Sequence, residues 1–238
     1  MARLTLANDY VMVYDDFLPK EAFESLLPYA NAESFWIGHQ AYWRKPWRMG
    51  DGMPVDGLST VYRDDPALYL PTEARYPTST ALDAFIDAVN GIASEASPLV
   101  GERGTAWTGI SFKTFIHPSG SGLSLHRDRH EYTGSYAFYV HHDWNFQWGG
   151  HLLVFDPRKY GRADRDYLEP KHSFFSDEDE NEVVSEPGLA LCVLPKPNRL
   201  VFIAPNTYHM ITRVDARAGD RARITFAGFF ISPSRGKS

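Results

Sequence analysis

The spacing of apolar residues changes near Pro98. Across Ser79–Ala96, apolar residues recur every three or four positions, which predicts an amphipathic helix capped by Ser79. A shorter helix is expected after Pro19, with Pro28 cutting or kinking it after about two turns. The first part of the chain therefore supplies mainly helices.

After Pro98, short runs rich in β-branched and aromatic residues alternate with Gly and Pro turns, a pattern typical of strands. The predicted strands are Tyr10–Val13 near the N-terminus and, later, Trp107–Ile116, Ser135–His142, His151–Asp156, Leu189–Leu194, Arg199–Ala204, Tyr208–Val214 and Ala222–Ile231. Many short strands predict an antiparallel sandwich or jelly roll. We expect one domain over residues 1–238, with residues 1–98 forming an N-terminal strand and supporting helices and residues 99–238 forming the jelly-roll core.

Two stretches lack a regular period and are expected to be loops. The first, Phe35–Pro54, contains Trp36, Trp43 and Trp47 among basic residues. It is either hydrophobic cover for the sheet or the wall of a pocket for an anionic or amphipathic substrate. The second, 157–187, is polar and contains an acidic run, which is typical of a solvated loop and less often of a lid over a site.

Composition narrows the classes of function. The 238 residues are 43% hydrophobic and 23% charged, as in an ordinary globular domain. A net charge of −6 repels nucleic-acid phosphates and anionic lipids, so neither nucleic acid nor a membrane is an expected partner. No apolar run has the length of a membrane span and no secretory leader is present, so we expect a cytoplasmic protein. The single cysteine, Cys192, lies in an apolar run and is expected to be a buried, inert thiol.

Candidate metal ligands occur in two His-x-Asp triplets, one formed by His126 and Asp128 and the other by His141 and Asp143. The first follows a flexible Gly- and Ser-rich link, and residues i and i+2 of an extended segment point to the same side. Downstream, His209 opens a predicted strand after a Pro-Asn turn. Two imidazoles and one carboxylate on one face of a metal form the facial triad of non-haem Fe(II) oxygenases.

A cation and a hydroxyl follow on the last predicted strand. Arg223 and Thr225 are two residues apart, so both lie on one face of that strand. Together they offer a bidentate cationic donor and a hydroxyl donor. This combination suits the distal carboxylate of a dicarboxylate co-substrate.

These residues stand in an order that resembles a known family. The matching stretches are Pro118-Ser-Gly-Ser-Gly-Leu-Ser-Leu-His126-Arg-Asp128, Asp143-Trp144, Trp148-Gly149-Gly150-His151-Leu152, Asn198–Ile203, His209 and Arg223–Phe230. The segment from Phe112 to Ile231 resembles the 2-oxoglutarate- and Fe(II)-dependent dioxygenases of the prolyl 4-hydroxylase-like type. About half of the chain carries the resemblance; each motif alone is weak, whereas the ordered set is specific.

The resemblance implies a mainly β fold with flanking helices, a cupin-like jelly roll known as the double-stranded β-helix. It implies that His126, Asp128 and His209 hold iron and that Arg223 holds 2-oxoglutarate, with Thr225 assisting. The implied cofactors are Fe(II), 2-oxoglutarate as co-substrate and O2, with ascorbate as a candidate reductant. The implied reaction hydroxylates an unactivated C–H bond and releases succinate and CO2. Asp128 indicates an oxygenase, because related halogenases carry a small residue at that position.

The chain departs from the family pattern in two places. Gly-Gly-His stands where the family usually has Gly-Gly-Glu, and His151 is expected to be a structural histidine. His209 lies 14 residues before Arg223, a longer gap than usual, so Arg221 stays open as a rival anchor for 2-oxoglutarate.

Other interpretations stay open. His141 and Asp143 form a less favoured metal pair, His117 is expected at the surface or beside the metal ligands, and Tyr132 and Tyr136 are candidates for the substrate entrance. The alternative functions are a cupin-like metal enzyme without 2-oxoglutarate, a peptidyl-proline hydroxylase and a non-catalytic jelly-roll binding module. We expect a small-molecule substrate, an amino acid or a natural-product intermediate, because little of the chain lies outside the predicted core. The oligomeric state is left open.

Overall fold

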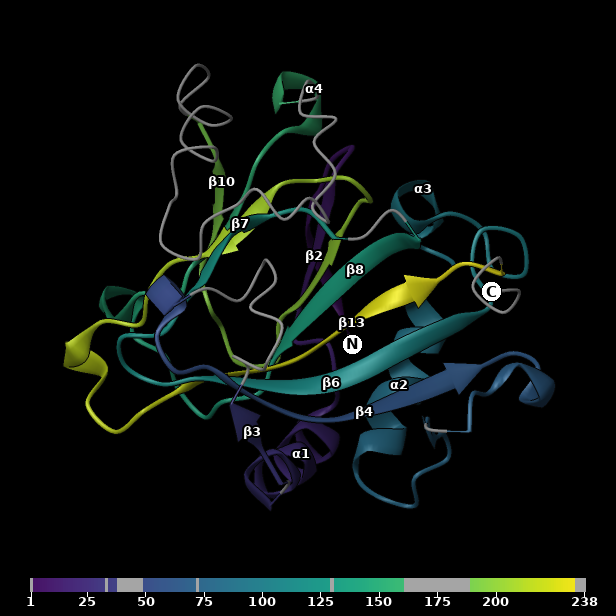
Figure 1. Ribbon diagram of the computed structural model, residues 1–238, viewed down its shortest axis with the longest axis horizontal. Helices are drawn as coiled ribbons and strands as arrows, with labels where there is room; N and C mark the ends of the chain where they lie inside the picture. The colour runs from purple at the N-terminus through teal and green to yellow at the C-terminus, as the bar shows by residue number, and fades with distance from the viewer. Residues whose placement is uncertain are drawn as a thin grey trace.

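Two facing β-sheets and flanking helices make up the computed structural model (Figure 1). The structure describes residues 2–32, 34–37, 49–71, 73–128, 131–160 and 189–233. The helices are α1 (Lys20–Ala32), α2 (Leu82–Ile92), α3 (Ser97–Val100) and α4 (Pro157–Tyr160). The first strands are β1 (Arg3–Ala7), β2 (Val11–Asp15), β3 (Trp36–Ile37), β4 (Val55–Arg63), β5 (Ala74–Arg75) and β6 (Gly109–His117). The later strands are β7 (Leu123–His126), β8 (Tyr132–Tyr139), β9 (Leu152–Val154), β10 (Leu191–Val193), β11 (Leu200–Ile203), β12 (His209–Ile211) and β13 (Arg223–Ile231).

Within the described residues, the large sheet has the order β1-β2-β11-β8-β13-β6-β4-β3, with β5 added beside β4. The small sheet has the order β10-β9-β12-β7. Neighbouring strands are antiparallel except for the pair β4–β5. The predicted mainly β, jelly-roll class with flanking helices is confirmed.

Helices α1, α2 and α3 cover the outer face of the large sheet, where alternate apolar residues of the central strands point. Phe85 of α2 stacks on Phe138 of β8 with ring centroids 4.6 Å apart. The same ring contacts Phe112 of β6 at 5.8 Å and Phe226 of β13 at 5.4 Å. This aromatic cluster fixes the helices to the sheet and leaves the opposite face for other contacts.

The inner face of the large sheet packs on the small sheet. A second apolar cluster joins Tyr139, Val201 and Ile203 of the large sheet to Leu152 and Val154 of the small sheet. Directly paired residues of neighbouring strands point to the same side, and so do residues two apart on one strand. The cluster therefore identifies which residues of each sheet face the space between the sheets.

Every strand predicted between residues 107 and 231 is present within a few residues of its expected bounds. Strands β1, β3, β4, β5 and β7 were not predicted, and β3 lies in the stretch Phe35–Pro54 that was expected to be a loop. Strand β7 has four residues and follows a Gly- and Ser-rich segment, so its sequence carries little periodic signal.

Two details of the predicted helices are wrong. Helix α2 begins at Leu82, and Ser79 does not cap it. Instead Asp83, in the first turn, accepts hydrogen bonds from the backbone N–H groups of Thr78 and Ser79 at 2.7 Å each. The proline was expected to cut or kink helix α1, and the cut does not occur: the helix continues to Ala32, with apolar residues packed on the core on both sides of Pro28.

The expected burial of Cys192 is also wrong: the thiol is exposed. Strand β10 lies at the edge of the small sheet and pairs there with β9. Val193 points into the apolar cluster between the sheets, so the preceding residue points outward. No described helix has the length and apolar character needed to span a bilayer.

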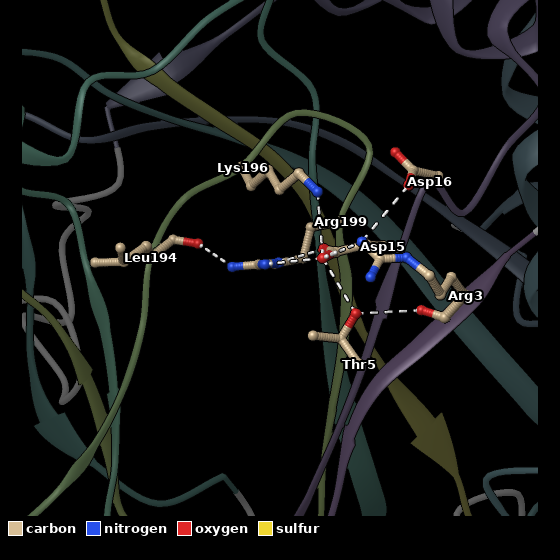
Figure 2. Close-up of polar contacts among 7 residues, drawn as sticks. All are labelled: Arg3, Thr5, Asp15, Asp16, Leu194, Lys196 and Arg199. Atoms are coloured by element: carbon tan, nitrogen blue, oxygen red, sulfur yellow. Dashed lines mark hydrogen bonds and ion pairs between the residues drawn. The ribbon is translucent and has the colours of Figure 1, made fainter.

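A cluster of ion pairs ties β1, β2 and the start of β11 together (Figure 2). Asp15 is 3% exposed and accepts hydrogen bonds from Arg199 Nε at 2.7 Å and Nη2 at 3.1 Å. Lys196 Nζ lies 3.2 Å from the same carboxylate, and the Thr5 hydroxyl donates to it at 3.1 Å. Burial by itself would raise the pKa of Asp15, but the hydrogen bonds and charges of Arg199 and Lys196 outweigh burial and lower it from 3.8 to about 2.

We expect Asp15→Asn to lower the free energy of unfolding by about 1–2 kcal/mol at neutral pH. This value is smaller than the full pKa shift would give, because Lys196 is partly exposed and solvent screens its charge. A lowered carboxyl pKa stabilises the fold above the unfolded value and loses that effect as pH falls toward about 2. The difference between wild type and variant should therefore shrink below about pH 4. Urea unfolding at several pH values measures this difference. The exposed neighbour is the control: Asp16→Asn should change stability little, and equal effects of the two substitutions would contradict the assignment.

Candidate metal centre and co-substrate site

Two histidines and an aspartate of the small sheet converge on one point. His126, at the end of β7, pairs directly with His209, at the start of β12, and their ring centroids lie 4.2 Å apart. Asp128 Oδ1 lies 3.9 Å from Nε2 of each histidine. In the part of the chain that the structure describes, these three residues form the one group of three or more potential ligands, with ligand atoms within 4.8 Å of one another.

Hydrogen bonds to the backbone orient both imidazole rings. His126 Nδ1 lies 2.8 Å from the Ser124 carbonyl oxygen, and His209 Nδ1 lies 3.0 Å from the Thr207 carbonyl oxygen. A carbonyl oxygen only accepts, so each Nδ1 donates its proton and Nε2 is the ring nitrogen left to face a metal. Both Nε2 atoms lie on the side of Asp128. Two Nε2 atoms and one carboxylate are the donor set of a facial triad, so these residues fit a divalent cation such as Fe(II).

The converging residues face the large sheet. His209 pairs directly with Val154, whose side chain belongs to the apolar cluster between the sheets. His126 pairs with His209 and therefore points the same way. These two histidines and Asp128, here called the metal-type cluster, thus lie on the small-sheet side of the space between the two sheets.

A buried arginine lies on the inner face of the large sheet. Arg223, at the start of β13, is 1% exposed, and its Nη1 lies 3.4 Å from Thr225 Oγ1. Its guanidinium group lies 5.0 Å from the centroid of the Tyr139 ring. Its Nε and the Tyr139 hydroxyl have no hydrogen-bond partner, and among the described residues no carboxylate forms an ion pair with it. A buried cation without an anion is unfavourable, so this site is built to receive an anionic group.

Two histidines flank this arginine. His117 of β6 pairs directly with Arg223, and His141 follows Tyr139 by two residues on the same side of the chain. Burial, followed by the positive charge of Arg223, lowers the pKa of His117 well below 6.5 and that of His141 to about 3. Both imidazoles are neutral at physiological pH and do not add to the charge of the arginine. His117 is 1% exposed, so the expectation that it lies at the surface is wrong.

A glycine leaves room for the arginine side chain. Gly150 has φ of 67°, and a Cβ atom there would lie 3.0 Å from Arg223 Cδ and 3.4 Å from Trp144 Cζ2. Trp144 is held by a hydrogen bond from its Nε1 to the Gly149 carbonyl oxygen at 3.0 Å and packs against His141. The lack of a side chain at Gly150 therefore leaves space for the Arg223 side chain, with Trp144 close by.

The structure separates the alternative candidates from these two clusters. Arg221 is half exposed, with its Nε 3.8 Å from Asp143 Oδ1 and its guanidinium group over the Trp148 ring. His141 and Asp143 do not converge, because the histidine is buried beside Arg223 while the aspartate side chain is 68% exposed. The His151 ring makes a hydrogen bond of 2.7 Å to the Phe146 carbonyl oxygen, which agrees with the structural part that we expected of it.

The remaining aromatic candidates fall in different places. Tyr136 is 2% exposed and donates its hydroxyl to the Ser111 carbonyl oxygen, so it is a core residue rather than part of an entrance. Tyr132 is partly exposed and stacks on Phe229. Trp36 is 46% exposed. Trp43 and Trp47 lie outside the described residues, as does most of the expected loop or lid at 157–187. Sequence reasoning missed Tyr139, whose signal is its alternation with His141 on one strand.

The buried histidines predict a specific pH dependence. A histidine pKa lowered by folding stabilises the protein above the unfolded value and loses this effect as pH falls toward the folded value. Between about pH 7 and pH 5 the wild type should therefore lose about 2 kcal/mol more stability than His141→Asn. Urea unfolding of both proteins at the two pH values provides the measurement. Parallel losses would contradict a buried neutral His141; the exposed neighbour, as His142→Asn, is the matched control.

Comparisons with solved structures find the same fold elsewhere. No protein-family model matches the sequence, and no curated protein matches it. A prolyl-4-hydroxylase from Pseudomonas putida superposes with a TM-score of 0.60 at 16% identity, covering 95% of this chain and 95% of that chain. A prolyl hydroxylase from Trichoplax adhaerens, solved with a hypoxia inducible factor peptide fragment, has a TM-score of 0.59 at 14% identity and covers 96% and 86%. HygX from Streptomyces hygroscopicus, solved with nickel, 2-oxoglutarate and hygromycin B, has a TM-score of 0.56 at 10% identity and covers 94% and 84%.

The chain therefore has the jelly-roll fold of the 2-oxoglutarate/Fe(II) oxygenases, of the prolyl 4-hydroxylase-like type. The resemblance expected from the sequence is confirmed at the level of the fold. The likeness comes from three-dimensional structure, at identities of 10 to 16%.

Proposed function

We propose that this chain is a 2-oxoglutarate- and Fe(II)-dependent dioxygenase formed by one domain over residues 1–238. It hydroxylates an unactivated C–H bond of a small molecule and releases succinate and CO2. One observation carries the proposal: two histidines and an aspartate converge on the same inter-sheet space that holds a buried arginine, and no carboxylate of the described residues forms an ion pair with that arginine. A metal and a dicarboxylate would satisfy the two clusters together.

In this proposal His126, Asp128 and His209 hold Fe(II) through two Nε2 atoms and one carboxylate. A facial triad leaves three coordination positions for other ligands. Iron bound with 2-oxoglutarate and O2 supplies the oxidising chemistry, and ascorbate is a candidate reductant. The protein holds the ligands in place through the Ser124 and Thr207 carbonyl groups and excludes water through the apolar cluster between the sheets.

Arg223 binds the distal carboxylate of 2-oxoglutarate, and Thr225 and Tyr139 donate hydroxyl hydrogen bonds to it. The guanidinium Nε and the tyrosine hydroxyl are buried without partners, so a carboxylate would satisfy both at once. Because the rings of His117 and His141 are neutral, the guanidinium group of Arg223 is the positive charge that pairs with the negative charge of the distal carboxylate.

The substrate is a small molecule, an amino acid or a natural-product intermediate. HygX was solved with hygromycin B, a small molecule, whereas the Trichoplax adhaerens enzyme was solved with a peptide fragment. The fold thus serves both kinds of substrate. We favour the small molecule, as expected from the sequence, and we retain the cytoplasm as the expected location. A peptidyl-proline hydroxylase is the second candidate.

Anaerobic addition of Fe(II) and then 2-oxoglutarate to metal-free protein should produce a visible metal-to-ligand charge-transfer band. His126→Ala and His209→Ala should each abolish the band and turnover, because each removes one of three ligands. Asp128→Gly is expected to retain iron while losing hydroxylation. The control is His142→Ala, an exposed residue outside the site, which should behave as wild type. Iron binding without a band would favour the cupin-like enzyme, and no iron binding would favour a binding module.

Arg223→Ala should chiefly weaken 2-oxoglutarate binding, by about 2–5 kcal/mol, as for the loss of one partner of a buried charge pair. Arg221→Ala should leave the affinity close to wild type, because that guanidinium group already contacts Asp143 and Trp148 at the surface. Titration of the charge-transfer band with 2-oxoglutarate gives both affinities. The opposite ranking of the two variants would move the anchor to Arg221.

A further inference from the structure

A half-exposed row lies two rows from the buried arginine on the inner face of the large sheet. Strands β6, β13 and β8 are neighbours in that order (Figure 1). Lys113 of β6, Ala227 of β13 and Ala137 of β8 are directly paired and form this row. Ala137 pairs onward with Val201, which belongs to the apolar cluster between the sheets. The whole row therefore faces the small sheet, as the buried row through Thr225 does.

The two rows differ in burial and in charge. Thr225 and Tyr139 are at most 2% exposed, whereas Lys113, Ala227 and Ala137 are all partly exposed. Neither alanine carries atoms beyond Cβ, so ligand atoms can approach the sheet between the two rows. Successive rows lie two residues apart, about 6.6 Å along the strands. The row of Lys113 is thus about 13 Å from the row of Arg223, a span that fits a five-carbon dicarboxylate and a small substrate side by side.

An ion pair lies at one end of the half-exposed row. The Lys113 ammonium group contacts the Asp56 carboxylate of β4 and lies 5.8 Å from the centroid of the Phe115 ring. The Lys113 side chain is 31% exposed and that of Asp56 is 16% exposed. The register of β4 shifts between Asp56 and Ser59, and such bulges re-aim side chains beside functional sites. The pair therefore offers both signs of charge to a ligand between the sheets.

An unpartnered hydroxyl lies one row further along. Ser135 of β8 is 5% exposed, and its Oγ has no hydrogen-bond partner in the part of the chain that the structure describes. It pairs directly with Phe229 and with Ile203, and the isoleucine belongs to the cluster between the sheets, so the hydroxyl is on the inner face. Tyr132 stacks on Phe229 at 4.2 Å and forms an aromatic boundary there. A buried hydroxyl without a partner is unfavourable until a ligand supplies one.

We propose that Lys113, Asp56 and Ser135 bind the primary substrate and that this substrate is a free amino acid in its zwitterionic form. The assignment rests on the proposed oxygenase function. The substrate carboxylate pairs with Lys113, its ammonium group pairs with Asp56, and a polar part of its side chain reaches Ser135. When a zwitterion binds, the ion pair between Lys113 and Asp56 is replaced by two ion pairs with the ligand, and no charge is left unpaired. An anion would leave Asp56 without its partner, and a cation would do the same to Lys113.

The test measures succinate formation from 2-oxoglutarate by the iron-loaded protein. The probes are the twenty proteinogenic amino acids, each also supplied as its N-acetyl derivative and as its carboxamide. We expect stimulation by one or more free amino acids and a loss of at least about tenfold when either charged group is blocked. Lys113→Met and Asp56→Asn should each reduce the stimulation by a similar factor, and Lys113→Arg should retain most of it. Lys20→Met, at an exposed lysine of α1, is the matched control and should respond as wild type.

A second variant, Ser135→Ala, tests substrate binding without an expected loss of folding stability. Because the Ser135 hydroxyl has no partner, Ser135→Ala should not lower the thermal unfolding temperature. It should raise the KM for the stimulating amino acid severalfold. An unchanged KM would overturn the part given to Ser135.

The outcomes separate this proposal from the oxygenase function. A charge-transfer band without stimulation by any free amino acid overturns the substrate assignment alone. Equal stimulation by N-acetyl or carboxamide derivatives also overturns it. If Lys113→Met retains full stimulation and has a lower unfolding temperature, the ion pair between Lys113 and Asp56 is a structural contact between strands. That result overturns its role in substrate binding. Absence of the band overturns both proposals.

Discussion

The position of β12 between β9 and β7 is the constraint on which the site depends. Pairing with β9 sets His209 beside Val154, and pairing with β7 sets it opposite His126. Because side chains on a strand alternate, a slip of one residue in either register would turn a histidine away from the space between the sheets. The apolar packing of Val154 against the large sheet opposes such a slip and so preserves the geometry of the metal-type cluster.

Polar side chains on the inner face of the large sheet are arranged in rows that differ in burial. The most buried part of this face, the rows of Arg223 and Thr225, holds one cation, two neutral histidines and a tyrosine hydroxyl that has no hydrogen-bond partner among the described residues. Further along the sheet lie the lysine that pairs with Asp56, two alanines and a serine hydroxyl that likewise lacks a described partner. This gradient from buried to half-exposed positions suits a small co-substrate that binds first and deep, followed by a substrate that binds nearer to solvent. The outer face, by contrast, is apolar and carries the helices.

Much of this arrangement could be predicted from the sequence. Alternating β-branched residues located seven strands between residues 107 and 231, and the order of His126, Asp128, His209 and Arg223 singled out the residues that the structure places in the two clusters. Features that depend on pairing between distant strands could not be predicted. His117 is buried because it pairs with Arg223, more than a hundred residues away, and Lys113 meets Asp56 because β4 pairs with β6. Cys192 was misassigned because an apolar run does not reveal which residue of an edge strand points outward.

In the proposed enzyme, one inter-sheet space holds iron at one wall and the 2-oxoglutarate carboxylate at the other. The decisive experiment is a crystal structure of the protein grown without oxygen, with Fe(II) and 2-oxoglutarate. We expect iron bound by the Nε2 atoms of His126 and His209 and by Asp128, with the distal carboxylate of 2-oxoglutarate on Arg223 and Tyr139. Iron bound by other residues, or the distal carboxylate on Arg221, would contradict it.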